Sequence, residues 1–249
     1  MINDETKRKL RELKLNEIIA ILELQQADKN TIILSFNERI QQIVDYLYQE
    51  KYNNRIKMLM RMANFRLPKA DINCIYYEER GINKNTITEL STCQFVDNHI
   101  NIIFQGFTGS GKTYLACAIG RAACKLQIKT RYIRLPDLLM EYQESQLLPK
   151  GKAKFLKKYE GCNVLIIDEW LLEDMTDDEQ RFILELIERR YDSSSTIFCT
   201  QYKKDEWHSR LGGGIRADAI MDRIVHNATW IETGKLNMRE YCAKNSLND

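Results

Sequence analysis

One stretch of this chain decides its fold: Ile102-Ile103-Phe104-Gln105-Gly106-Phe107-Thr108-Gly109-Ser110-Gly111-Lys112-Thr113. It joins an apolar run to a glycine-rich loop of spacing G-x-x-x-x-G-K-[ST], which predicts a strand, a phosphate-binding loop and a helix in succession. We expect Gly106, Gly109 and Gly111 to adopt positive φ, so that successive backbone N–H groups point inward and hold phosphate oxygens. The N-terminal end of the following helix favours the same anion. The loop therefore predicts a nucleoside triphosphate site.

Two side chains of the loop have roles of their own. Lys112 is expected to neutralise the β- and γ-phosphates, and Thr113 to ligate Mg²⁺ through its hydroxyl. The predicted nucleotide contacts in the loop are Gly106, Phe107, Thr108, Gly109, Ser110, Gly111, Lys112 and Thr113.

A second motif, Val164-Leu165-Ile166-Ile167-Asp168-Glu169, ends an apolar run in two carboxylates. Ligands of parallel sheets bind at the carboxyl ends of strands, which places both groups beside the loop. Asp168 is expected to hold Mg²⁺, and Glu169 to orient and deprotonate the water that attacks the γ-phosphate. A second carboxylate directly after the metal-binding one favours hydrolysis over transfer to an acceptor. The pair therefore predicts an ATPase that uses ATP and Mg²⁺, rather than a nucleotide kinase.

A third apolar run, Thr196-Ile197-Phe198-Cys199, is followed by Thr200 and Gln201. Parallel strand order would place this strand between the loop and Asp168. Thr200 or Gln201 would then lie next to the γ-phosphate as a hydrogen-bonding sensor.

The composition is that of a soluble globular protein. The chain has 249 residues, of which 44% are hydrophobic and 29% charged, and its net charge is +2. Nucleic-acid binding would therefore depend on local basic patches rather than on overall charge. No apolar run is long enough to span a bilayer, so no membrane partner is expected. The seven cysteines form no C-x-x-C pair, and several lie in apolar runs, which indicates reduced core residues in a cytoplasmic protein.

The chain divides into three regions by pattern. Residues 1–66 contain neither Gly nor Pro and are predicted to form a small all-helical N-terminal domain. Ser35-Phe36-Asn37-Glu38 is a capping-box candidate for a helix in that domain. Pro68 ends the helical region, 67–98 is expected to be a connector, and 99–249 the ATPase domain.

The last region predicts an α/β fold. Strand candidates are 101–105, 130–135, 163–167, 196–200 and 229–232, separated by helical segments. Near-continuous apolar strands that alternate with helices predict a five-stranded parallel sheet covered by helices on both faces. Pro136 and the capping box at Thr176 are expected to begin two of these helices.

Two basic runs are candidates for phosphate contact. From Lys51 to Ala70 there is no acidic residue, and a solvated face and a phosphate-binding face are both compatible with this pattern. The candidate nucleic-acid contacts in this first run are Lys51, Arg55, Lys57, Arg61 and Arg66. Those in the second run are Lys150, Lys152 and Lys154.

The chain resembles the DnaC/IstB family of AAA+ ATPases and is most similar to its IstB-type transposition helpers. The resemblance covers nearly the whole chain and is carried by Leu34-Ser35-Phe36-Asn37-Glu38-Arg39, Gly106–Thr113 with Tyr114, Asp168-Glu169-Trp170, Arg189-Arg190-Tyr191, Thr200-Gln201 and, most specifically, residues 217–228. It implies a P-loop NTPase of the AAA+ type and adds Tyr114 to the nucleotide contacts.

The resemblance also implies a site shared between subunits. Arg223 matches the arginine finger that reaches a neighbouring subunit's γ-phosphate, and Arg239 matches the sensor arginine on the C-terminal side. The loop Gly212-Gly213-Gly214-Ile215-Arg216 departs from the family pattern, so Arg216 is a competing finger candidate. Few residues follow the last strand, and a full C-terminal lid is therefore not expected. Nucleotide closure would then depend on a neighbouring subunit in a ring or filament.

Members of the helper type assemble on duplex DNA and present it to a partner transposase. The resemblance therefore implies an ATP-dependent transposition helper with largely sequence-independent DNA contacts. Two alternatives remain open: a replicative helicase loader, and a nucleotide-gated architectural DNA-binding protein with little hydrolysis. The Leu34–Arg39 run favours the transposition branch.

Overall fold

The computed structural model describes residues 2–245, and the chain divides into two compact units between Met58 and Leu59. The predicted boundary at residue 66 differs from this division. Ala63 and Phe65 are buried in the core of the second unit, so the residues just after Met58 belong to that unit.

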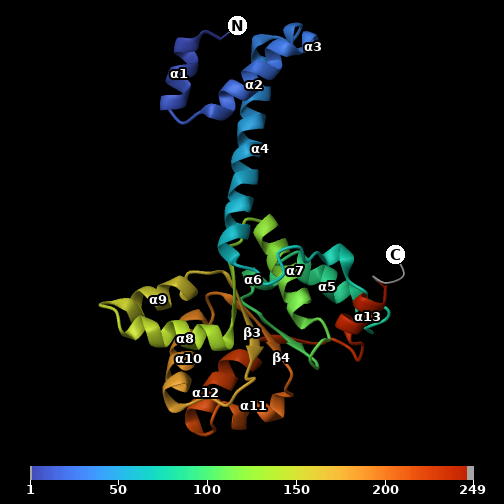
Figure 1. The fold of residues 1–249 in the computed structure, drawn as a ribbon, viewed down its shortest axis with the longest axis vertical. Helices are drawn as coiled ribbons and strands as arrows, with labels where there is room; N and C mark the ends of the chain where they lie inside the picture. Colours follow the sequence, from blue (N-terminus) through green and yellow to red (C-terminus); the bar gives the residue numbers. More distant parts are fainter. Residues whose placement is uncertain (1, 246–249) are drawn as a thin grey trace. The chain divides into compact units, whose positions relative to one another are not determined.

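The first unit is helical (Figure 1). It contains α1 (Asp4–Glu12), α2 (Asn16–Ala27), α3 (Lys29–Ile32) and the first part of α4 (Phe36–Ala63). The predicted capping box begins α4, because the Ser35 backbone N–H donates to the Glu38 carboxylate at 2.7 Å and the Glu38 N–H to the Ser35 hydroxyl at 3.4 Å. The buried amide of Gln25 joins α2 to α4 by donating to the Arg39 carbonyl at 3.0 Å.

The second unit contains a five-stranded parallel sheet with the order β2-β3-β4-β1-β5. Its strands are β1 (Asn101–Gln105), β2 (Thr130–Arg134), β3 (Val164–Trp170), β4 (Ser195–Thr200) and β5 (Ala228–Glu232). The predicted α/β fold is confirmed. The strands are apolar on both faces because helices cover both faces.

Alternate residues of each strand pack into different halves of the core. Ile102 and Phe104 pack in one core cluster with α7, while Ile103 packs in the other cluster, with the helices of the opposite face. The first layer consists of η1 (Ile72–Cys74), α5 (Lys84–Ser91), α6 (Gln94–Asp97) and α7 (Lys112–Lys125). The second consists of α8 (Leu135–Gln146), α9 (Gly151–Glu160), α10 (Asp177–Arg190), α11 (Lys204–Arg210) and α12 (Gly214–Val225). The helix α13 (Met238–Asn245) follows the last strand.

The segment 67–98, expected to be a connector, is part of the folded core. Ile82, Ile87, Leu90 and Phe95 are each less than 9% exposed and pack in the same cluster as the central strands. Its apolar side chains are widely spaced along the sequence, which is why no regular period revealed their burial.

Two sequence expectations concern single positions. Pro136 lies in the first turn of α8 and the capping box at Thr176 begins α10, as predicted. Five of the seven cysteines are buried, and Cys74 and Cys242 are exposed. Within residues 2–245, no helix combines the length and the apolar character needed to cross a bilayer.

A buried arginine joins α10 to β4. Arg190 is 2% exposed, and its guanidinium donates to the carbonyls of Tyr159, Cys162 and Ser195 at 2.8, 2.8 and 2.6 Å. It also donates to the Thr196 hydroxyl at 3.1 Å. Burial lowers the pKa of Arg190 to about 10, so the group remains charged at neutral pH.

Replacing Arg190 by Met should lower the free energy of unfolding by about 3 kcal/mol, because buried carbonyls lose their donor. Urea unfolding followed by circular dichroism measures the effect. The neighbouring Arg189 forms exposed ion pairs with Glu160 and Glu185 and provides the control. Arg189→Met should cost much less stability, and equal losses in the two variants would contradict the structural role of Arg190.

Candidate nucleotide-binding site

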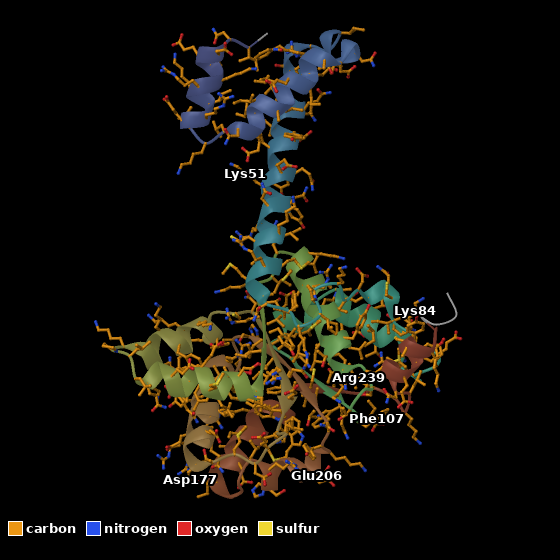
Figure 2. The ribbon with its side chains drawn as sticks, viewed as in Figure 1. Lys51, Lys84, Phe107, Asp177, Glu206 and Arg239 are labelled. Carbon is orange, nitrogen blue, oxygen red and sulfur yellow. The ribbon has the colours of Figure 1, made fainter. Side chains whose placement is uncertain are left out.

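A cleft of about 660 Å³ lies at the carboxyl ends of β1, β3 and β4. This volume is typical of a cofactor site. The predicted residues that line it are Thr108, Gly109, Gly111, Lys112, Thr113, Tyr114, Asp168, Glu169, Gln201 and Arg239. Phe107 of the loop and Arg239 of α13 lie on the same side of the unit (Figure 2). Residues far apart in the sequence are therefore brought together as the motifs predicted.

The loop has the conformation of an anion cradle, with one correction. Gly109 and Gly111 have φ of +91° and +87°, as expected. Gly106 does not have positive φ, and the expectation for it was wrong. It is needed for a different reason, since a Cβ at this position would clash with the Thr233 hydroxyl. That hydroxyl shares a 2.6 Å hydrogen bond with the buried Ser110 hydroxyl and donates to the Gln105 carbonyl at 3.1 Å.

Lys112 begins α7 and points along the loop. Its ammonium donates to the carbonyls of Gly106 and Phe107 at 2.6 and 2.9 Å. Burial lowers the pKa of Lys112, because desolvation disfavours its charged form.

Asp168 is the centre of the predicted metal site. It is 2% exposed, and its Oδ2 accepts from the Thr113 hydroxyl at 2.8 Å and from the Tyr132 hydroxyl at 2.8 Å. A hydroxyl and a carboxylate side by side are hard oxygen donors of the kind that Mg²⁺ prefers. The pair Thr113–Asp168 therefore fits the ion. Tyr132 could not be predicted as a site residue, because a strand-end pattern does not distinguish it from a core residue.

Glu169 stands on a distorted strand end. Its φ is +57°, and the pairing of β3 with β4 shifts register between Ile167 and Trp170. Its carboxylate lies 3.0 Å from Arg66 Nη1 and 3.6 Å from Arg134 Nε. A hydrogen bond to Glu169, and to a smaller extent one to Tyr132, raises the pKa of the Arg66 guanidinium. Arg66, predicted from sequence as a nucleic-acid contact, thus lines the nucleotide cleft.

Arg134 was also missed from the sequence. It ends β2 and lies in register with Asp168 on the neighbouring strand. Its place beside Asp168 can be recognised only once the pairing of β2 with β3 is known.

The two sensor candidates differ in burial. Thr200 is 1% exposed, and its hydroxyl donates to the Trp170 carbonyl at 3.1 Å and accepts from the Tyr202 N–H at 3.1 Å. The side chain of Gln201 lines the cleft, and its Oε1 accepts from the Thr108 hydroxyl at 2.8 Å. Strand β4 lies between β1 and β3 as expected, and Gln201 is the residue that reaches the cleft.

Arg239 lies on the first turn of α13, at the C-terminal side of the cleft. The helix is joined to the loop because the Met238 N–H donates to the Gly109 carbonyl at 2.9 Å. Met238 and Cys242 line the cleft beside Arg239. Arg239 thus lines the cleft, and its role as a sensor stays a prediction.

A buried arginine from outside the motifs lies behind the loop. Arg80 is 4% exposed and donates to the Ser110 carbonyl at 2.5 Å. A Cβ on Gly111 would lie 3.0 Å from its Nη2, so the guanidinium packs directly against the loop. Burial lowers the pKa of Arg80 to about 10. The segment before β1 therefore supports the phosphate cradle.

The two finger candidates lie outside the cleft of their own chain. Arg223 forms an ion pair with Glu188 and donates to the Ala219 carbonyl at 3.0 Å. Arg216 lies 3.6 Å from Asp177 at the start of α10. Neither position conflicts with a finger that acts on a neighbouring subunit, and the choice between them stays a prediction.

The predicted nucleic-acid contacts differ in their surroundings. In the first unit, Lys51, Arg55 and Lys57 are exposed on α4. In the second unit, Lys150 and Lys154 are exposed, whereas Lys152 is paired with Glu185 at 2.8 Å. Their contact with nucleic acid stays a prediction.

A family model described as IstB-like ATP binding protein matches residues 8–246. The chain belongs to this family. An insertion sequence ATP-binding protein of Sinorhizobium fredii is 31% identical to this IstB-like protein over 209 residues, which cover 83% of this chain and 84% of the relative. The ATP-binding protein of insertion sequence IS232 from Bacillus thuringiensis subsp. berliner is 31% identical over 196 residues, or 79% of this chain and 78% of the relative. The resemblance inferred from the motifs is confirmed.

Solved structures support the fold of the IstB-like protein. DnaI superposes with a TM-score of 0.57 at 21% identity, over 69% of this chain and 91% of that structure. The DnaC helicase loader superposes with a TM-score of 0.57 at 24% identity, over 66% of this chain and 96% of that structure. These similarities establish the AAA+ fold, and the family establishes ATP as the nucleotide.

Replacing Lys112 by Ala should weaken ATP binding by about 10- to 100-fold, because a charge-assisted contact to phosphate is lost. Titration with a fluorescent ATP analogue measures the affinity. Lys125→Ala, at the other end of α7, is the matched control and should bind ATP like the wild type. Equal effects of the two substitutions would contradict the assignment of the cleft.

Proposed function

We propose that this IstB-like protein is a Mg²⁺-dependent ATPase. The observation that supports this most is the arrangement of Thr113, Asp168 and Glu169 at one end of the cleft. Thr113 and Asp168 would hold Mg²⁺, which supplies charge neutralisation at the β- and γ-phosphates when bound. The Glu169 carboxylate would accept a proton from the attacking water, and Gln201 would donate a hydrogen bond to the γ-phosphate.

Three groups would complete the charge around the triphosphate. Lys112 would leave the loop carbonyls for the phosphate oxygens, and Arg239 would approach from α13. Arg223 of a neighbouring subunit would stabilise the charge of the transition state, so that activity depends on a homo-oligomeric ring or filament.

We propose further that the protein acts in the cytoplasm as a transposition helper. It would assemble on duplex DNA when ATP is bound and deliver the DNA to a partner transposase. The names of the relatives, which are insertion sequence proteins, support this role. The exposed cations of the two basic runs would contact the phosphate backbone without regard to sequence.

A second candidate function is that of a replicative helicase loader. The fold similarity to the DnaC helicase loader favours it, but this likeness is below 25% identity and concerns the fold alone. Assembly in the presence of ATP on duplex DNA, compared with single-stranded DNA and with a replicative helicase, discriminates between the two. Preference for the helicase would support the loader.

Replacing Glu169 by Gln should lower DNA-stimulated phosphate release at least about 100-fold, because the general base is lost, while ATP binding is retained. Phosphate release with and without duplex DNA is the measurement. Glu173→Gln, which changes an exposed carboxylate soon after β3, should keep the wild-type rate. Negligible release in the wild type would indicate the architectural alternative instead.

A finger in trans predicts complementation between two inactive variants. Arg223→Ala should lower DNA-stimulated turnover by about 1000-fold, and Lys112→Ala should be inactive through loss of ATP. Mixing the two should restore part of the activity, because a Lys112→Ala subunit can offer its Arg223 to the intact loop of an Arg223→Ala subunit. If Arg216→Ala behaves this way and Arg223→Ala does not, Arg216 is the finger.

A further inference from the structure

A buried cation packs against the phosphate loop from a turn that belongs to none of the sequence motifs. Arg80 is 4% exposed, and its Nη2 donates to the Ser110 carbonyl at 2.5 Å. A Cβ on Gly111 would lie 3.0 Å from the same Nη2 and 3.3 Å from Cζ. Gly111 lines the cleft, whereas Arg80 is not among the described residues that line it. Arg80 can therefore act on a bound nucleotide only through the loop.

The charge of Arg80 is unbalanced within residues 2–245, the described part of the chain. Its guanidinium forms no ion pair in that range, and its buried Nε has no hydrogen-bond partner there. The carboxylates next to it in sequence, Glu78 and Glu79, are exposed. Burial lowers the pKa of Arg80 to about 10, so the group is charged at neutral pH. A buried charge without a partner is costly, and an anion that binds nearby recovers part of that cost.

The other deeply buried arginine shows the contrast. The guanidinium of Arg190 donates to three carbonyls and one hydroxyl, and its hydrogen bonds join α10 to β4. Among the described residues, the guanidinium of Arg80 donates to the Ser110 carbonyl alone. The hydrogen bonds of the fold therefore account for Arg190 but leave the buried charge of Arg80 without a structural reason.

The backbone around Arg80 is fixed on two sides. Gly234, just after β5, has φ of +75°, and a Cβ there would lie 1.9 Å from the Arg80 carbonyl oxygen. Ile82 is 6% exposed, and its N–H donates to the Tyr77 carbonyl at 3.1 Å, which closes the turn that carries Arg80. The guanidinium is thus held against the loop before any nucleotide binds.

The hydrogen bond to Ser110 acts on a group that faces the phosphates. The Ser110 carbonyl and the Gly111 N–H belong to one peptide unit, and the Gly111 N–H is one of the donors expected to hold phosphate oxygens. A charge-assisted bond to the carbonyl polarises that peptide and makes its N–H a stronger donor. The charge of Arg80 also attracts phosphate directly, because a buried charge is screened less than an exposed one.

We propose that Arg80 is a positioning residue that sets the affinity of the loop for the triphosphate, by orienting and polarising the Ser110–Gly111 peptide with a charge that stays unbalanced until a polyphosphate binds. This inference rests on binding of ATP in the cleft and not on the proposed hydrolysis. The unliganded protein bears the cost of the buried charge, and the ATP-bound protein recovers it.

Affinity for ATP, measured by isothermal titration calorimetry, is the first test. R80M should bind ATP about 5- to 20-fold more weakly than the wild type, because a charge-assisted hydrogen bond to the loop is lost. R80K keeps the charge and should recover part of the affinity. R190M is the matched control, since it removes a buried arginine at the other end of β4, and it should bind ATP like the wild type. All titrations are made at a temperature where melting curves show each variant folded.

Inorganic tripolyphosphate isolates the part of the affinity that belongs to the phosphates. Its competition with a fluorescent ATP analogue gives its affinity for each variant. R80M should weaken tripolyphosphate by about the same factor as ATP, because the loss arises at the loop and not at the base or the ribose. An unchanged affinity for tripolyphosphate in R80M would overturn the proposal.

Thermal melting with and without ATP gives a sign that a purely structural arginine would not give. Without nucleotide, R80M should melt at or above the wild-type temperature, because an unbalanced buried charge has been removed. The rise in melting temperature on addition of ATP should be smaller in R80M by about 2–5 °C, because stabilisation by a ligand follows its affinity. An unliganded R80M that melts well below the wild type would show that Arg80 serves the fold, and would overturn the proposal.

The remaining outcomes separate this inference from the others. Equal ATP affinities of R80M and the wild type, or equal losses in R80M and R190M, would overturn the role of Arg80 alone. A wild type that binds neither ATP nor tripolyphosphate would overturn the assignment of the cleft as well. Binding of ATP without hydrolysis would overturn the proposed ATPase activity and would leave the role of Arg80 to be decided by the affinities.

Discussion

The position of β4 between β1 and β3 is the constraint on which the rest of the site depends. All five strands are parallel, so their carboxyl ends lie along one edge. The Gly106 N–H donates to the Thr200 carbonyl at 3.1 Å, which joins the start of the phosphate loop to the end of β4. On the other side of β4, the end of β3 carries Asp168 and Glu169. One strand thus sets the distance between the loop and both carboxylates, and it also places Gln201 between them.

The charge around the cleft is arranged for a polyanion. Lys112, Arg66 and Arg239 line it, while the carboxylates of Asp168 and Glu169 are each engaged by neighbouring donors. The partial burial of Lys112 strengthens its attraction for phosphate because fewer water molecules screen its charge. A bound triphosphate would balance the positive charge of Lys112, Arg66 and Arg239. A bound Mg²⁺ would balance the negative charge of Asp168.

The segment before the first strand belongs to this site as much as the motifs do. Arg80 donates to the Ser110 carbonyl of the loop, and Arg66 donates to the Glu169 carboxylate. Both residues come from the part of the chain that pattern alone assigned to a helical domain and a connector. Through these two contacts the segment before β1 is joined to the loop and to the proposed base.

The order of strands and helices could be predicted from the sequence. The strands 101–105, 130–135, 163–167, 196–200 and 229–232 agree with β1 to β5 to within one residue at each end, except that β3 continues three residues further, to Trp170. Long apolar runs and capping boxes are local signals, and parallel pairing follows from their alternation with helices. The loop and the Asp168-Glu169 pair are contiguous in sequence, and their chemistry was predicted for the same reason.

The partners of those motifs could be recognised only in the tertiary structure. Tyr132, Arg134, Arg80 and Arg66 are single residues with no spacing that distinguishes them from core or surface positions. Arg66 in particular was interpreted from the charge of its neighbours in sequence, whereas its contact with Glu169 spans 103 residues. By itself, the sequence determined the fold, the phosphate loop and the carboxylates, because these depend on local patterns. Folding decided which side chains contact them, because long-range contacts leave no periodic signal in the chain.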